Sequence, residues 1–133
     1  MRHVAVVHRK YAMQILSGEK TAELRLTKNR IAPFGVVKKG DTVFIKVASG
    51  PVCCRARVKT VEQHEGLTPG AIPGLRRALT PVVKGDDAYW NLKSTARYAT
   101  VIHLERVTAC DEAPGLAEAR ARNPRAAWLV LGD

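Results

Sequence analysis

The feature of this sequence that most limits its fold is a series of apolar, β-branched runs that are short and bounded by turn residues. Such runs are typical of β-strands. Few helical patterns separate them, so a mixed or antiparallel sheet is favoured over a doubly wound one, and a small closed barrel fits. We expect an α+β fold of about five or six strands decorated by short helices. The predicted strands cover residues 3–8, 20–26, 42–48, 52–64, 97–110 and 126–132.

Helical signals are short and lie between these strands. Gly18 follows an amphipathic stretch and suits the left-handed residue that ends a helix. Asp86 is a typical N-cap ahead of a second short helix. Helices are predicted over residues 9–18, 75–79 and 85–95, with a marginal one over 112–124.

The length of the chain, 133 residues, suits one domain with one core. We expect a single domain over residues 1–133, with a monomer favoured over an oligomer. No apolar run approaches the about 18 residues that a membrane span requires, and the first residues show no signal-peptide cleavage pattern. We therefore expect a cytoplasmic protein without a membrane partner. No zinc-binding spacing of cysteine and histidine is present, so no metal site is predicted.

Positive charge is concentrated in the first half of the chain. Residues 1–60 contain 13 lysines and arginines and three acids, whereas residues 61–133 contain nine of each. The net charge of +10 therefore arises from the first half. Such asymmetry points to a polyanionic partner, and nucleic acid is the commonest one. A basic surface that only aids solubility is the alternative.

One segment of this basic half, ILSGEKTAELRLTKNR at residues 15–30, places Lys20, Glu23 and Arg25 within six positions after a predicted helix end. Glu23 and Arg25 share the strand face opposite the apolar residues, and we expect this face to point outward. The three side chains either form an ion pair at a strand edge or line a pocket that binds or cuts an anionic ligand. A carboxylate there suits a nucleobase edge or a general base better than a phosphate contact.

The same segment resembles the ASCH domain family of the PUA-like superfamily, whose signature is Gly-x-Lys-x-x-Glu-x-Arg. Gly18, Lys20, Glu23 and Arg25 complete that signature here. The stretches VKKGDTVFI and RYATVIHLERV also look like parts of the family's barrel, so the resemblance covers roughly residues 3–108. It implies a small PUA-like β-barrel with the motif lining a cleft on one side.

The resemblance also implies a role in RNA metabolism, either as an RNA- or nucleotide-binding module or as an enzyme. One branch is similar to amidohydrolases that remove the acetyl group of N4-acetylcytidine. That branch has a lysine at the position of Lys20 and a threonine three residues later, where this chain has Glu23. It also has a glutamate on a later strand, for which Glu62 or Glu65 is the candidate here. Another branch is similar to metal-assisted ribonucleases, and only in that case is a divalent metal expected as a cofactor.

For the binding hypothesis, we expect the cleft to take an unpaired nucleotide and nearby cations to hold flanking phosphates. Rings among charges would stack bases, although Trp90 has the alternative role of anchoring its helix to the barrel. The predicted cleft residues are Gly18, Lys20, Thr21, Glu23 and Arg25. The predicted phosphate contacts are Lys28, Arg30, Lys38, Lys39, Arg55, Arg57 and Lys59. The predicted stacking residues are Trp90, Arg97 and Tyr98.

For the enzymatic hypothesis, the catalytic candidates are Lys20, Glu23 and Glu62. Lys20 would act as a nucleophile or base only if burial or a cationic neighbour lowered its pKa by several units. Arg25 would lower that pKa and Glu23 would raise it. A third hypothesis is an interaction module whose basic face binds an acidic protein.

Overall fold

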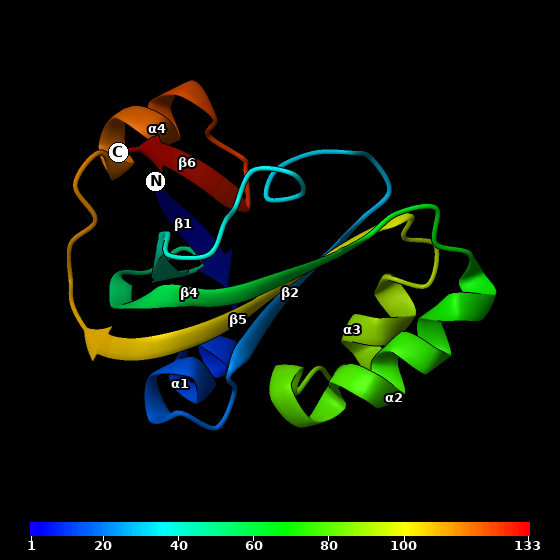
Figure 1. Ribbon diagram of the computed structural model, residues 1–133. Helices are drawn as coiled ribbons and strands as arrows, with labels where there is room; N and C mark the ends of the chain where they lie inside the picture. Colours follow the sequence, from blue (N-terminus) through cyan, green and yellow to red (C-terminus); the bar gives the residue numbers. More distant parts are fainter.

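Six strands form one curled sheet whose order is β2-β5-β4-β3-β1-β6 (Figure 1). In this computed structural model, which describes residues 1–133, β1 runs parallel to β3 and the other neighbours are antiparallel. The predicted α+β class and mixed sheet are confirmed. The sheet is a half-barrel rather than a closed one, because β2 and β6 are edge strands. The strands are β1 (Arg2–Val7), β2 (Ala22–Thr27), β3 (Thr42–Val47), β4 (Val52–His64), β5 (Tyr98–Ala109) and β6 (Trp128–Gly132).

Short helices cover the sheet from three directions (Figure 1). The N-terminal helix α1 packs into the interior of the half-barrel. Helices α2 and α3 cover one part of its outer face, and α4 covers another part. No helix combines the length and the hydropathy needed to cross a membrane. The helices are α1 (Arg9–Ser17), the 3-10 helix η1 (Pro69–Ala71), α2 (Ile72–Val83), α3 (Asp87–Leu92) and α4 (Leu116–Arg122).

Helix α2 extends well beyond the predicted residues 75–79. Its first turn contains Pro73, and a proline is tolerated there because the first amides of a helix have no partner within it. Ile72, Leu79 and Val83 are buried along one face and pack against β2 and β5. Burial of this face, rather than local propensity, therefore accounts for the length of α2.

Side chains of the sheet divide into an inner and an outer set, because directly paired residues share a face. The inner set includes Ile45, Val58 and Ile102, which are fully buried in the half-barrel. The outer set of β2 and β5 includes Leu26 and Val101, which pack under α2 and α3. One face of β2 is therefore covered by α2 and α3, and its other face, which carries Glu23 and Arg25, points into the half-barrel.

Gly18 ends α1 in the left-handed conformation, with φ of 86°, as predicted. The chain then turns tightly into β2. The amide of Lys20 donates to the carbonyl of Gln14 at 2.9 Å, and the amide of Thr21 donates to the carbonyl of Val82 at 3.0 Å. These two bonds attach the turn to both α1 and α2, so the start of β2 has a defined position.

Candidate functional site

The polar motif residues of β2 project into the half-barrel. Ala22, Leu24 and Leu26 lie on the outer face under α2 and α3, as the alternation predicts. Glu23 and Arg25 lie on the opposite face, which the sequence places outward to solvent. That expectation is wrong for Glu23, which is 5% exposed, because the curl of the sheet makes this face an interior surface.

The carboxylate of Glu23 is the centre of a buried ion network. Its Oε2 accepts a hydrogen bond of 2.9 Å from Arg25, and its Oε1 lies 3.5 Å from the ammonium of Lys20. Oε1 also accepts a bond of 3.1 Å from the amide of Leu24. Burial by itself would raise the pKa of Glu23, but the Arg25 and Lys20 cations outweigh it and hold that pKa below its usual value. Glu23 is therefore an anion that holds two cations together.

Lys20 is almost fully buried, at 3% exposure. Its Nζ donates a hydrogen bond of 2.6 Å to the carbonyl of Val83 and lies 5.3 Å from the centroid of the Tyr11 ring. Burial lowers the pKa of Lys20, although the charge of Glu23 acts in the opposite direction. A small cavity of about 20 Å³ adjoins the ammonium, and it has room for about one water molecule.

Arg25 connects the two free edges of the half-barrel. Its guanidinium donates to the carbonyl of Val6 at 3.0 Å and to the carbonyl of Ala127 at 3.3 Å, besides its bond to Glu23. It also lies 5.5 Å from the ring of Trp128. The two terminal nitrogens are thus occupied by the protein, so Arg25 is not a free two-pronged donor for a ligand. Its Nε is buried without a hydrogen-bond partner.

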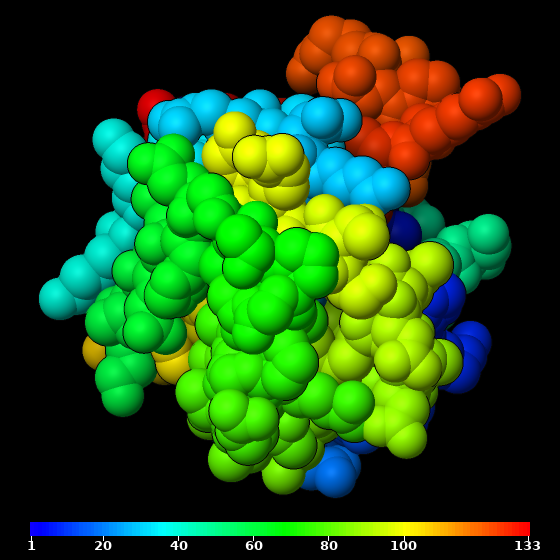
Figure 2. Space-filling view, turned by 90° about the vertical axis from the view of Figure 1, so that its right-hand side faces the viewer, coloured from blue at the N-terminus to red at the C-terminus, as the bar shows by residue number.

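A cleft of about 780 Å³ opens along the gap between the edge strands β2 and β6, and we call it the seam cleft. Its walls come from the end of β1, from β2, from residues 31–33, from α3, from α4 and from the start of β6. Figure 2 shows the surface hollowed between the orange-red segment of α4 and the yellow-green segment of α3. Glu23 and Arg25 line this cleft, and Glu23 also borders the smaller cavity beside Lys20.

Two cations of the cleft, Lys93 and Arg122, are absent from the site predicted from the sequence. Lys93 follows Tyr89, another lining residue, by four positions at the end of α3, and this helical spacing is the signal that could have identified Lys93. The hydroxyl of Tyr89 donates to the carbonyl of Leu24 at 3.2 Å. Trp90, one of the candidates for base stacking, is 3% exposed in the core under α2 and α3. Trp90 therefore has its alternative role, which is to anchor α3 to the sheet.

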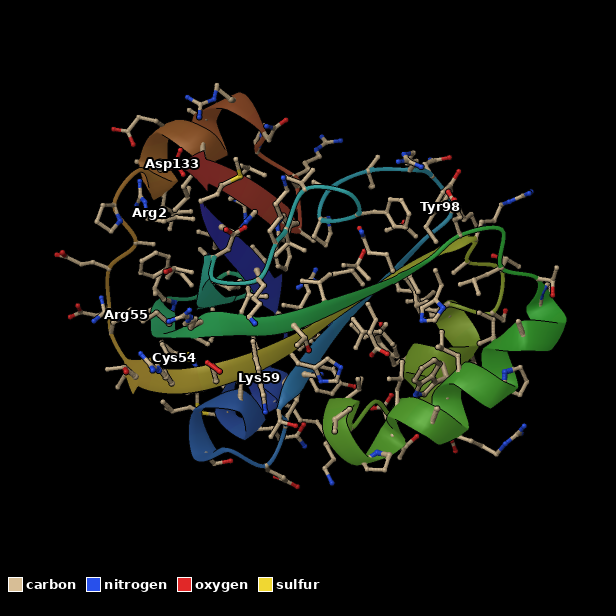
Figure 3. The ribbon with its side chains drawn as sticks, viewed as in Figure 1. Arg2, Cys54, Arg55, Lys59, Tyr98 and Asp133 are labelled. Atoms are coloured by element: carbon tan, nitrogen blue, oxygen red, sulfur yellow. The ribbon has the colours of Figure 1, made fainter.

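The basic row of β4 lies on the outer face of the sheet, away from the seam cleft. Arg55, Arg57 and Lys59 are all exposed, whereas the alternate residues Cys54 and Val58 are buried inside. Figure 3 shows Arg55 at the start of β4 and Lys59 farther along the same strand. The structure thus does not bring these three cations to the motif.

Glu62 also lies on the wrong side of the sheet to act with Lys20. A register shift between Val58 and Thr60 reverses the alternation of β4, so Glu62 points outward. There its Oε2 lies 2.9 Å from Nε2 of His103, and its side chain is 53% exposed. The structure therefore does not bring Glu62 together with Lys20 and Glu23.

The other predicted cations are scattered. Lys38 and Lys39 are exposed in the turn before β3, beside the start of β1, whereas the seam cleft lies at the end of β1. Arg30 lies 4.8 Å from the ring of Phe34, which packs edge-on against Tyr98. Residues without a place in the lining of either cavity are Gly18, Thr21, Lys28, Arg30, Arg97 and Tyr98.

No group of three or more His, Cys, Asp or Glu side chains in residues 1–133 is arranged to hold a metal ion. The three cysteines, at positions 53, 54 and 110, are free thiols.

Comparison with known proteins identifies the fold. The sequence profile of the ASCH domain matches residues 6–122. The crystal structure of ASCH from Zymomonas mobilis has a TM-score of 0.73 at 18% identity, with 99% of this chain and 88% of that chain covered. A tyrosine-to-phenylalanine variant of ASCH from Zymomonas mobilis has a TM-score of 0.63 at 15% identity, with 94% and 83% covered. The ASCH domain from Lactobacillus crispatus has a TM-score of 0.50 at 13% identity, with 80% of each chain covered. No curated protein sequence matches this chain, and at these identities the structural likeness concerns the fold alone.

Proposed function

Because this chain belongs to the ASCH domain family, we propose that it binds unpaired RNA, or a single nucleotide, in the seam cleft. The observation that carries this proposal is a cleft of about 780 Å³ with Glu23 and Arg25 at its floor and Lys20 directly behind them. Pockets for small ligands typically have about 300–1,000 Å³, so a nucleotide fits.

The walls of the seam cleft suit a nucleobase. Most of the lining is apolar, and the half-buried Tyr11 and Tyr89 contribute aromatic rings. The guanidinium of Arg25, which lies 5.5 Å from the buried ring of Trp128, adds a planar group to this lining. Single-stranded bases bind proteins by stacking on such planes.

The charge of the seam cleft suits a polyanion. Three cations, Arg25, Lys93 and Arg122, line it, and Glu23 is the one acid among its lining residues. Glu23 holds the floor together through its bonds to Arg25 and Lys20. Phosphate contacts in such a site release counterions, so affinity for RNA should fall steeply with salt.

A charge placed in the cleft tests the proposal. Ala127 is an exposed lining residue, and the matched control Ala78 is exposed on α2, outside the cleft. We expect Ala127→Glu to weaken binding of a labelled single-stranded RNA by at least about tenfold in fluorescence anisotropy, because like charges repel. Ala78→Glu should change affinity far less. Equal effects of the two variants, or wild-type binding that does not change with salt, would contradict the proposal.

A hydrolase is the second candidate function, and the state of Lys20 favours it. Burial lowers the pKa of this lysine, and a cavity of about 20 Å³ beside it has room for about one attacking water. The test is incubation with N4-acetylcytidine, and with single-stranded RNA with and without a divalent metal. Turnover that disappears in Lys20→Ala supports an enzyme. No turnover by the folded protein leaves the binding function.

A further inference from the structure

The charges of the seam cleft are not balanced by the protein. Glu23 compensates one of the two cations in contact with it, Lys20 and Arg25. Lys93 at the end of α3 and Arg122 at the end of α4 also line the cleft. Neither of these two side chains forms an ion pair or a hydrogen bond within the protein.

Lys93 is the more informative of the two, because it is half-buried. Burial lowers its pKa, and the positive charge of Arg25 lowers it further. Lys93 and Arg25 therefore repel each other within the lining of the cleft, and Lys93 has no acidic partner. A partly buried ammonium in this situation is stabilised when an anion lies beside it.

We infer that Lys93, at the end of α3, and Arg122, at the end of α4, form an anion subsite in the lining of the seam cleft, and that this subsite takes a phosphate group of the bound nucleotide. The inference rests on the proposed function and deepens it, because it names a phosphorylated ligand over a neutral nucleoside. Lys93 supplies a point charge from α3, and Arg122 supplies a fork of donors from α4.

Exposed apolar side chains of the cleft suit the part of the nucleotide that is not phosphate, which is its sugar or base. Leu92 and Ile31 are large apolar residues, 78% and 55% exposed, and both line the seam cleft. They offer contact surface for a sugar or base next to the phosphate. Leu92 directly precedes Lys93, so apolar and cationic contacts are adjacent on α3.

Isothermal titration of each ribonucleoside and of its 5′- and 3′-monophosphates tests the inference on the wild type, Lys93→Gln, Arg122→Gln and Arg77→Gln. Arg77 is the matched control, because it is exposed on α2 and outside the cleft. We expect at least one monophosphate to bind wild type about tenfold more tightly than its nucleoside. Lys93→Gln and Arg122→Gln should remove most of that gain and weaken monophosphate binding far more than nucleoside binding, and Arg77→Gln should alter neither.

Two failures are distinguishable. If nucleoside and monophosphate bind wild type equally, or if Lys93→Gln weakens both to the same extent, the anion subsite is wrong while binding in the cleft stands. If neither nucleotides nor single-stranded RNA bind the wild type at low salt, the proposed function fails and the subsite fails with it. Circular dichroism of each variant shows whether the fold is kept.

Discussion

Arg25 on β2 donates a hydrogen bond of 3.0 Å to the main-chain carbonyl of Val6 on β1, across the open side of the half-barrel. The sheet itself leaves β2 as an edge strand, so this contact supplies a link that main-chain pairing does not. The family-signature arginine thus has a structural role in addition to any contact with a ligand.

Replacement of Arg25 by lysine should weaken this link. An ammonium cannot reproduce the planar fork that reaches Val6, Ala127 and Glu23 together. We expect Arg25→Lys to lower the free energy of unfolding by about 1–3 kcal/mol, as measured by urea denaturation. Arg57→Lys, at an exposed position of β4, is the control and should be nearly neutral. Equal stability of the two variants would show that the link across the seam is unimportant.

Loss of the Glu23 charge should be more damaging. Glu23→Gln leaves the buried Lys20 beside the half-buried Arg25 without an anion between them. Removal of one partner from a buried ion network typically costs about 3–5 kcal/mol. The control Glu62→Gln breaks an exposed pair with His103 and should cost at most about 1 kcal/mol. Chemical denaturation of both variants decides the matter, and similar losses would contradict the network.

His3 should make stability depend on pH. It is fully buried; Trp128 donates to its Nδ1 at 3.2 Å, so its Nε2 carries the proton donated to Asp41 at 2.8 Å. Burial lowers the pKa of His3, although Asp41 acts in the opposite direction. Because the unfolded chain binds the extra proton more readily, the free energy of unfolding should decrease as the pH falls below about 6.5.

The carboxylates of Asp41 and Glu23 do not contribute to the pH dependence of stability near pH 6.5. The pKa values of Asp41 and Glu23 are lowered, so their stabilisation is lost only at more acidic pH. Urea denaturation between about pH 5 and 7 should show the slope in the wild type and in the exposed control His64→Gln, but not in His3→Gln. A slope retained in His3→Gln would assign it to another group.

Gly85 should not tolerate a side chain. A Cβ at this position would lie 2.8 Å from Nε1 of Trp90 and 3.1 Å from a ring carbon of Tyr89. We expect Gly85→Ala to displace α3 and to cost about 1–3 kcal/mol, measured as a decrease in the free energy of unfolding. At Gly70 the nearest atom to a new Cβ is 3.9 Å away, so Gly70→Ala is the control. A neutral Gly85→Ala would mean that α3 packs less tightly than described.

The fold could be predicted from the sequence where the signals are local. The prediction of β4 over residues 52–64 matches the structure, because alternation and a preceding turn mark the strand. The N-cap role of Asp86 is also confirmed, since its side chain accepts a bond from the amide of Tyr89. The left-handed turn at Gly18, which ends α1, is likewise predicted from a local signal.

The site could be predicted only in part, because its geometry depends on contacts distant in sequence. Arg25 reaches Ala127, which is 102 residues away, and no local pattern signals that contact. The side of the sheet on which Glu62 lies depends on one register shift after Val58. The burial of Glu23 follows from the curl of the sheet, which alternation within β2 does not reveal.

An amide NMR titration with single-stranded RNA tests the central claim most directly, because it locates the bound ligand on the surface. If the seam cleft is the binding site, the amide signals of Thr27, Lys93 and Ala127 should shift first. The signals of Arg55 and Lys59 on the outer face of β4 should stay in place. Shifts confined to the outer face of β4, with the cleft unchanged, would contradict the account.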